Sequence, residues 1–385
     1  MASVMISCGE ASGDLYAGAL TTELRRLRPG IRVTGLGGDR LRAAGAELVG
    51  DYRGLAVTGL VEAVRVLPRA WRMQQTLVAH ARAERPDALV VIDFPDFNVR
   101  LASRLHRLGV PVVYYICPQV WAWRRSRLRD MKRFTDRALV IFPFEEAIYR
   151  EADIPVRFVG HPLLDLEVAG LSREEILAQV GFEPDAPTIA LLPGSRPNEL
   201  RAILPTISHA LPLIAARLPR AQFLVARAPN LADDLFAPVA RLSTSFTIAT
   251  LEARADDVLA AADVVITASG TATVQTAMHE RPMVIVYRVS PLTYLLGKRF
   301  VTVSTYGMAN LVAGERIVPE LIQDGFTPEA VAAETLRYFD DPAYAARTRD
   351  RLRDVRAALG ATGASRRAAE QVLEVCALAG KPSAT

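Results

Sequence analysis

The sequence predicts an α/β protein with two similar domains that face each other across a ligand-binding cleft. Two stretches, one in each half of the chain, are built alike: residues 4–8 run into Gly9–Asp14, and residues 188–192 run into Pro193–Arg196. Each is an apolar run of strand length, followed by a turn of small residues and a helix-like pattern. Such a helix start exposes backbone N–H groups at the positive end of the helix dipole. We therefore expect a phosphorylated ligand between the two domains.

The composition allows two hydrophobic cores and narrows the class of protein. The chain has 385 residues, 50% of them hydrophobic, and a single core rarely grows beyond roughly 250–300 residues. The net charge is +4, and the sequence contains no long run of basic residues, which argues against a nucleic-acid groove. Cys8, Cys117 and Cys376 form no Cys-x-x-Cys pair, and we see no signal peptide or long apolar span, so we expect a cytoplasmic location. The histidines lack metal-ligand spacing, and we expect no metal site.

Residues 1–165 alternate strand and helix patterns and form the first predicted domain. Residues 88–92 are apolar throughout, as expected of a strand that helices cover on both faces. Gly35, Gly37 and Gly38 follow another strand, but Arg40 stands where a dinucleotide fingerprint requires its third glycine, so we expect no nicotinamide cofactor. The expected strands are 3–8, 31–35, 88–92, 111–116 and 137–142, and the expected helices are 13–27, 58–83, 98–107 and 144–151.

Residues 166–345 repeat the alternation and form the second predicted domain. Ser172, followed three residues later by Glu175, is typical of a capping box and predicts a helix at 173–180. From about residue 328 the pattern is helical, and we expect a C-terminal extension at 346–385 to return to the first domain. The expected strands lie near 188–192, 222–226, 246–250, 263–267 and 283–286.

Two carboxylates follow the buried strand of the first domain. Asp93 and Asp96 come directly after residues 88–92, at the carboxyl end where open parallel sheets bind ligands. A partly desolvated carboxylate there has a raised pKa and serves as a general base. Alternatively, such an acid caps the helix that begins near Asn98. We expect both interpretations to hold, one for each acid.

The second domain carries the residue types of a diphosphate site. Arg196 stands at the start of its first helix, beside Gly194 and Ser195, and an arginine suits forked contacts to phosphate. Ser269, Gly270 and Thr271 follow a later strand and offer hydroxyls and bare amides at another helix start. The alternatives are a surface pair between Arg196 and Glu199 and a plain helix cap at 269–271. Two helix starts and an arginine together favour the diphosphate site.

Residues 58–73 have a helical apolar pattern with arginines interleaved. A helix that packs on the core explains the pattern, and so does a helix lying in a membrane interface. We favour the membrane interface. The tryptophan-rich run at 118–125 is either a second functional loop or a loop packed on its own domain. The apolar positions of the helix are Leu60, Val61, Val64, Leu67 and Trp71, and the arginines are Arg65, Arg69 and Arg72.

Eight segments of the chain match, in order, those of an enzyme family. With them the chain resembles the lipid-A-disaccharide synthases, glycosyltransferases with the GT-B arrangement of two Rossmann-like domains. The resemblance covers residues 3 to about 325. The matching segments are Gly9–Asp14, Asp93–Asn98, Pro118–Arg124, Gly160–Leu163, Leu191–Arg196, Ser269–Thr273, Val286–Arg288 and Asn310–Gln323.

The resemblance implies a reaction and a location. The family joins UDP-2,3-diacylglucosamine to 2,3-diacylglucosamine 1-phosphate, which forms the β-1,6 disaccharide of lipid A and releases UDP. It works without a metal ion or other cofactor, peripherally associated with the inner, cytoplasmic membrane. The implied base on the acceptor 6-hydroxyl is Asp93. The implied substrate-binding residues are Glu10 and Ser12 in the first domain, and Arg196, Ser269, Gly270, Thr271, Gln275 and Asn310 in the second.

The chain departs from the family pattern at a few positions. Gln275 stands where the family commonly has a glutamate for the ribose hydroxyls, and Gln can accept a hydrogen bond but lacks the charge. Glu315 and Arg316 also reverse the usual basic–acidic order. Two other functions therefore stay open. One is another UDP-sugar enzyme of the same fold, such as a 2-epimerase, and the other is a non-catalytic, membrane-associated nucleotide-binding protein.

Overall fold

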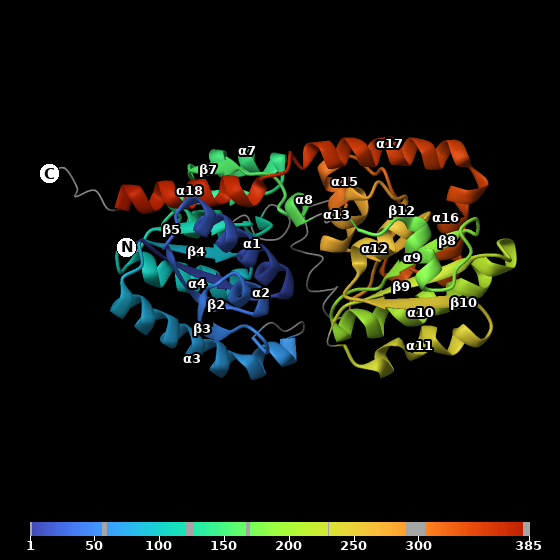
Figure 1. The fold of residues 1–385 in the computed structure, drawn as a ribbon, viewed down its shortest axis with the longest axis horizontal. Helices are drawn as coiled ribbons and strands as arrows, with labels where there is room; N and C mark the ends of the chain where they lie inside the picture. Colours follow the sequence, from blue (N-terminus) through green and yellow to red (C-terminus); the bar gives the residue numbers. More distant parts are fainter. Residues whose placement is uncertain are drawn as a thin grey trace. The chain divides into compact units, whose positions relative to one another are not determined.

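A computed structural model describes residues 2–55, 60–120, 127–166, 170–229, 231–289 and 305–379. The described chain divides into two compact units, each with its own sheet. The first unit holds residues 2–166 and 359–379, and the second holds residues 170–358 as far as they are described. Each unit is α/β, so the predicted fold class is confirmed (Figure 1).

The first unit contains a seven-stranded parallel sheet in the order β3-β2-β1-β4-β5-β6-β7. The strand order reverses between β1 and β4, which pair directly. In open parallel sheets, the carboxyl ends of the strands at such a switch point form the ligand site. The strands are β1 (Ser3–Cys8), β2 (Arg32–Gly37), β3 (Glu47–Asp51), β4 (Ala88–Ile92), β5 (Val112–Tyr115), β6 (Arg137–Val140) and β7 (Val156–Phe158).

Helices cover both faces of this sheet (Figure 1). One core lies between the sheet and the helices α3 and α4, where Leu77 and Leu101 are fully buried. On the opposite face α1 and α18 pack against each other and contact β4. The helices of this unit are α1 (Ala11–Leu27), α2 (Asp39–Ala43), α3 (Leu60–Glu84), α4 (Pro95–His106), α6 (Arg127–Met131), α7 (Pro143–Glu151), α8 (Leu163–Leu166) and α18 (Ala364–Ala379).

The second unit repeats this plan with a six-stranded parallel sheet in the order β10-β9-β8-β11-β12-β13. Here the order reverses between β8 and β11, so the turns after these two strands lie at the equivalent switch point. The internal similarity that the sequence suggested is therefore a similarity of topology. The strands are β8 (Thr188–Leu192), β9 (Gln222–Arg227), β10 (Thr247–Glu252), β11 (Val264–Ala268), β12 (Met283–Tyr287) and β13 (Glu320–Ile322).

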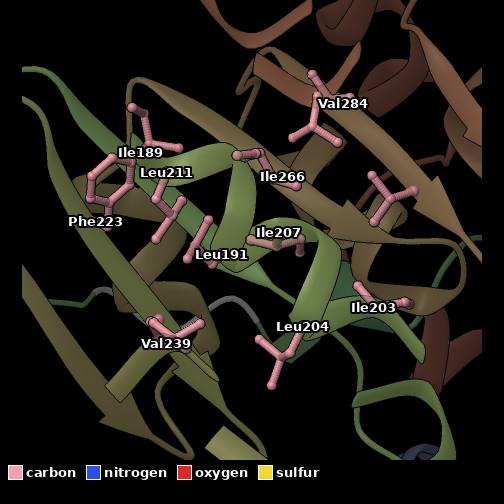
Figure 2. Packing of buried hydrophobic residues seen from close by; sticks show 14 of the residues in the cluster. Ile189, Leu191, Ile203, Leu204, Ile207, Leu211, Phe223, Val239, Ile266 and Val284 are labelled. Carbon is pink, nitrogen blue, oxygen red and sulfur yellow. The ribbon is translucent and has the colours of Figure 1, made fainter. Parts of the chain in front are cut away.

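Alternate residues of β8 supply two cores. Ile189 and Leu191 face α10, whose Ile203, Leu204 and Ile207 pack over the sheet (Figure 2). Ala190 and Leu192 belong to the core on the opposite face, as the two-residue period of a strand requires. The helices include α9 (Arg173–Gln179), α10 (Pro197–Arg217), α11 (Ala237–Ala240), α12 (Ala255–Ala261), α13 (Thr271–Met278), α15 (Met308–Ala313), α16 (Pro328–Asp340) and α17 (Pro342–Ala358).

The C-terminal helices belong to different units. We expected an extension at 346–385, but α17 belongs to the second unit, where Leu352 and Val355 are buried in the core. Only α18 returns to the first unit, as expected of a C-terminal helix. The Asp165 carboxylate accepts backbone N–H bonds from Gly363, Ala364 and Ser365, and so caps the start of α18. The first boundary lies after Leu166, next to the expected one.

Candidate functional site

The turn after β4 holds Asp93 in a strained conformation. Asp93 has φ 45° and the following Phe94 has φ 50°, a left-handed region that residues with a side chain rarely adopt. The Asp93 N–H donates to the carbonyls of Tyr115 and Ile116, at 3.3 and 3.2 Å. Its carbonyl accepts from Asn98 Nδ2 at 2.8 Å and from the Tyr114 hydroxyl at 3.2 Å. Backbone strain that neighbours fix in this way is typical of functional sites.

Asn98 is a residue whose role sequence reasoning missed. It is fully buried, its Oδ1 accepts from the Ser7 hydroxyl at 2.7 Å, and its Nδ2 also lies 3.2 Å from the Ser7 carbonyl. The same amide contacts the carbonyl of Ile92 at 3.1 Å. Asn98 therefore ties the carboxyl end of β1 to the turn that carries Asp93. Its place in the Asp93–Asn98 segment was the only available signal.

Asp96 has a different environment from Asp93. Its side chain is 84% exposed and pairs with Arg127. Helix α4 begins at Pro95 rather than Asn98, and its N-cap residue is Phe94, which has no capping side chain. The expectation that one acid caps this helix does not hold for Asp96, because its carboxylate pairs with the arginine instead. Of the two acids, Asp93 is the one held at the switch point of the sheet.

Glu10 and Ser12 lie at the same edge of the sheet as Asp93. Glu10 is the N-cap residue of α1, directly after β1, and both side chains are partly buried. A Cβ at Gly9 would lie 2.1 Å from the Phe94 ring, so the turns after β1 and β4 pack closely and require glycine. The structure thus brings together the three residues of the first unit that the resemblance assigned to a site.

Two buried aromatic groups contact each other in the first unit, and one of them, Tyr16, is close enough to Asp93 to respond to its charge. Burial raises the pKa of the Tyr16 hydroxyl, and the Asp93 charge raises it further. The Tyr16 ring contacts the His161 ring edge to face, with the centroids 6.2 Å apart. Burial lowers the pKa of His161 to about 3, so its imidazole is neutral at pH 7. Sequence reasoning assigned no role to either residue.

In the second unit, Arg196 is already engaged by a carboxylate. Arg196 Nη1 donates to Glu199 Oε1 at 3.1 Å. The other carboxylate oxygen, Oε2, accepts backbone N–H bonds from Ser195 at 3.0 Å and from Arg196 at 3.3 Å. The pair between Arg196 and Glu199 that the sequence allowed is therefore present. The backbone amides at the start of α10, which we expected to face a phosphate, are occupied by Glu199.

The start of α13 differs, because no side chain caps it. A Cβ at Gly270 would meet nothing within 4 Å, so the space before the helix is open. The Ser269 hydroxyl donates to the Tyr306 carbonyl at 3.1 Å, and the Thr273 hydroxyl donates to the Gly270 carbonyl at 2.8 Å. Among the described residues, the backbone N–H groups of Gly270 and Thr271 find no acceptor on the chain. Uncapped amides at a helix start form an anion site.

Gln275 lies one turn further along α13 and is partly buried. Within the described parts of the chain its side-chain amide makes no hydrogen bond. The amide can therefore donate to or accept from a ligand hydroxyl. Its position is compatible with the ribose contact that the resemblance assigned to it.

Asn310 was expected to bind substrate, but the chain itself satisfies its side chain. Its Nδ2 donates to the Val318 carbonyl at 3.0 Å and to Glu320 at 2.8 Å, and its Oδ1 accepts from the backbone of Ile317 and Val318. The residue is fully buried. These four bonds order the segment between α15 and β13 and occupy both donors and both acceptor positions of the side-chain amide, so a contact of Asn310 with substrate stays a prediction.

Helix α3 combines a buried face with an exposed apolar one. Leu77, Val78 and Ala81 are buried in the core of the first unit. Leu67 is 53% exposed and Trp71 is 59% exposed, and residues four apart lie on the same side of a helix. The side chains of Leu60, Val61 and Val64 lie outside the described residues, as do residues 121–125 of the tryptophan-rich run at 118–125.

Neither a membrane span nor a metal cluster is found in the described parts of the chain. No helix there is long and apolar enough to cross a bilayer. No group of three or more His, Cys, Asp or Glu side chains among those residues could hold a metal ion.

Comparisons with known proteins match the chain to the same family that its eight shared segments indicated. A family model described as Lipid-A-disaccharide synthetase matches residues 4–375. The chain belongs to the lipid-A-disaccharide synthetase family. It is 44% identical over 376 residues to the lipid-A-disaccharide synthase of Geobacter sulfurreducens, and the match covers 97% of each chain.

Solved structures share the fold at low sequence identity. A UDP-GlcNAc 2-epimerase from Neisseria meningitidis, bound to UDP-GlcNAc, has a TM-score of 0.70 at 12% identity, and the match covers 97% of this chain and 100% of the other. The glycotransferase of kitacinnamycin has a TM-score of 0.63 at 19% identity, with 97% and 98% covered. These likenesses show the fold alone. It is the GT-B type of fold, which glycosyltransferases and UDP-sugar epimerases share, as the resemblance implied.

Proposed function

We propose that this member of the lipid-A-disaccharide synthetase family is an inverting glycosyltransferase. It joins UDP-2,3-diacylglucosamine to 2,3-diacylglucosamine 1-phosphate and releases UDP and the β-1,6-linked disaccharide 1-phosphate. Family membership supports a glycosyltransferase that forms the lipid A disaccharide. The observation that carries the finer assignment is the geometry of Asp93, a carboxylate held in a left-handed turn at the switch point of the first sheet.

Asp93 acts as the general base in this proposal. Its carboxylate takes the proton of the acceptor 6-hydroxyl while that oxygen bonds to C1 of the donor sugar. The bond between C1 and the diphosphate oxygen breaks, and attack from the opposite face inverts C1. Asn98 and Tyr114 hold the Asp93 carbonyl and so limit where the carboxylate can point. Precise placement of a base contributes as much as its pKa does.

The second unit binds the leaving UDP. The open amides at the start of α13, with Ser269, Gly270 and Thr271, receive the diphosphate, and Arg196 adds positive charge. Gln275 contacts the ribose hydroxyls from the next turn. Donors aimed at the developing negative charge stabilise the transition state. This set supplies the stabilisation from the chain itself, so the proposal requires no cofactor.

The first unit binds the acceptor sugar and contacts the membrane. Glu10 and Ser12 line the acceptor position beside Asp93. The exposed Leu67 and Trp71 of α3 insert into the surface of the cytoplasmic membrane. An apolar helix face flanked by arginines binds an anionic lipid interface. Acylated substrates then reach the enzyme without leaving the bilayer.

A product assay tests the proposal. Purified protein is incubated with UDP-2,3-diacylglucosamine, with and without 2,3-diacylglucosamine 1-phosphate, and products are identified by mass spectrometry. The expected result is a disaccharide and UDP only when both substrates are present. Conversion of the donor alone to an epimer, detected by NMR, indicates a 2-epimerase instead. Binding of UDP without any turnover indicates the non-catalytic relative.

A further inference from the structure

Two glutamates occupy helix starts at the carboxyl edge of the second sheet. Glu199 accepts the backbone N–H groups of Ser195 and Arg196 at the start of α10. Glu320 accepts those of Tyr306 and Gly307, at 2.9 and 2.8 Å, just before α15. Each carboxylate therefore takes a place where a phosphate could bind. Of the helix starts after β8, β11 and β12, α13 alone has no such carboxylate among the described residues.

The two glutamates differ in how firmly they are held. Glu320 is 6% exposed, and its Oε1 also accepts from the Asn310 side chain, so moving it would break a buried network. The Glu199 side chain is 22% exposed and lies in the first turn of α10. It can turn toward solvent at the loss of only the bonds to the turn and Arg196. Glu320 is thus a fixed part of the fold, whereas Glu199 is placed to exchange with a ligand.

A glycine at position 194 allows Glu199 to approach the turn after β8. Gly194 has φ 119°, in the left-handed region. A Cβ at this position would lie 2.5 Å from the Glu199 carboxylate and 2.9 Å from its Cβ. Glycine is needed both for the conformation and for this approach. The Glu199 charge also reaches the end of β12, where it adds to the effect of burial in raising the pKa of Tyr287.

We infer that Glu199 is an internal counter-anion that competes with the diphosphate of UDP for Arg196 and thereby promotes release of the product. The inference rests on the proposed function, because it takes UDP as the ligand of Arg196. When the site is empty, Glu199 neutralises Arg196 and fills the amides of α10. When the diphosphate arrives, the Glu199 carboxylate either leaves or stays beside it, and both alternatives weaken binding of the anion. Bound UDP is therefore held less tightly than Arg196 and α13 alone would hold it.

Removing only the charge of Glu199 separates this role from a structural one. In Glu199→Gln, an amide oxygen of the same reach still accepts from Ser195 and Arg196, so the turn is kept. Loss of the repulsion tightens UDP binding by roughly 3- to 10-fold, as expected for one charge at a partly solvated site. If Glu199 served only to position Arg196, the same variant would bind UDP more weakly. The two roles thus predict changes of opposite sign.

The experiment measures binding of UDP and of inorganic pyrophosphate by titration calorimetry. The variants are wild type, Glu199→Gln, Glu199→Asp, which keeps the charge, and Glu175→Gln as a matched control. Glu175 occupies the same capping position on α9, and its Oε2 accepts the Ser172 backbone N–H at 2.7 Å, but its cap contains no arginine at the N-cap position. We expect tighter binding of both anions and stronger product inhibition by UDP in Glu199→Gln alone, with melting temperatures close to wild type.

The outcomes separate this inference from the proposed function. Equal or weaker anion binding by Glu199→Gln overturns the counter-anion role, and so does an equal gain in Glu175→Gln. If wild type binds pyrophosphate but not UDP, the proposed function is wrong. Pyrophosphate binding by the variants then still tests the counter-anion role of Glu199. If wild type binds neither anion, both are wrong.

Discussion

Replacing Leu67 and Trp71 together by serine should release the protein from anionic vesicles without unfolding it. Both side chains are more than half exposed on α3, at 53% and 59%. Each therefore contributes little to the core of the first unit and much to a surface that could enter a lipid interface. Their loss should leave the packing of the other face of α3 intact.

The exposed fractions of Leu67 and Trp71 determine how much vesicle affinity the double variant should lose. Full burial of a leucine contributes about 2 kcal/mol, so the exposed half of Leu67 contributes about 1 kcal/mol on insertion. A tryptophan side chain has roughly 200–250 Å² of surface, so the exposed part of Trp71 contributes about 3 kcal/mol at ~25 cal/mol per Å². The sum of about 4 kcal/mol corresponds to a loss of roughly 10³-fold in vesicle affinity. Arg69 and Arg72 remain, so residual binding should be weak and sensitive to salt.

Co-sedimentation with anionic vesicles free of substrate measures the affinity, and a melting curve measures the fold. Leu77→Ser is the control on the same helix, because Leu77 is fully buried. That change should destabilise the protein by about 2–5 kcal/mol. If the double variant binds vesicles as wild type does, the membrane role of α3 is refuted. If it melts like the control, the exposed face is part of the core.

Three further predictions concern single residues of the two units. Asp93→Asn should lower turnover by roughly 10²–10⁴ with an unchanged melting curve. Asp96→Asn should have little effect on turnover, because that carboxylate is exposed. The reverse pattern would show that the base is misassigned. Arg196→Ala should weaken UDP binding in calorimetry by about 1.5–3 kcal/mol, the contribution of a charged hydrogen bond, and unchanged binding contradicts its role. Burial lowers the pKa of His161 to about 3 from 6.5, so the unfolded chain binds a proton that the folded chain does not. Stability should therefore fall as the pH drops from 6.5 toward 3, by about 2 kcal/mol at pH 5 from this residue; an NMR titration of His161 near pH 6.5 would show this to be wrong.

The sequence predicts the central part of each sheet better than its edges. Runs such as Ala88–Ile92 are apolar throughout because helices cover both faces, and their pattern alone identifies them. The edge strands β3 and β7 were not predicted. They are short and only partly buried, so no apolar run of strand length marks them. Their pairing partners, rather than their own residues, determine that they are strands.

Candidate site residues were predictable where their position after a strand in the sequence places them at the edge of a sheet. Asp93 directly follows β4, and Arg196 ends the short turn after β8. In each sheet, parallel topology brings such residues to the carboxyl edge. Contacts between distant residues were not predictable. The bond between Ser7 and Asn98 spans 91 positions, and no local pattern announces it. The hydrogen bonds of Asn310 were not predictable for the same reason, because its partners became visible only in the folded chain.

The stereochemistry of the product tests the central claim most directly. Wild-type protein is given both acylated substrates in the presence of EDTA, and the product is analysed by NMR. The account predicts a disaccharide 1-phosphate with a β-1,6 linkage, formed at the same rate with and without the chelator. An α linkage would contradict inversion with Asp93 as the base. Loss of the reaction in EDTA and its recovery with magnesium would contradict stabilisation of UDP by Arg196 and α13 alone.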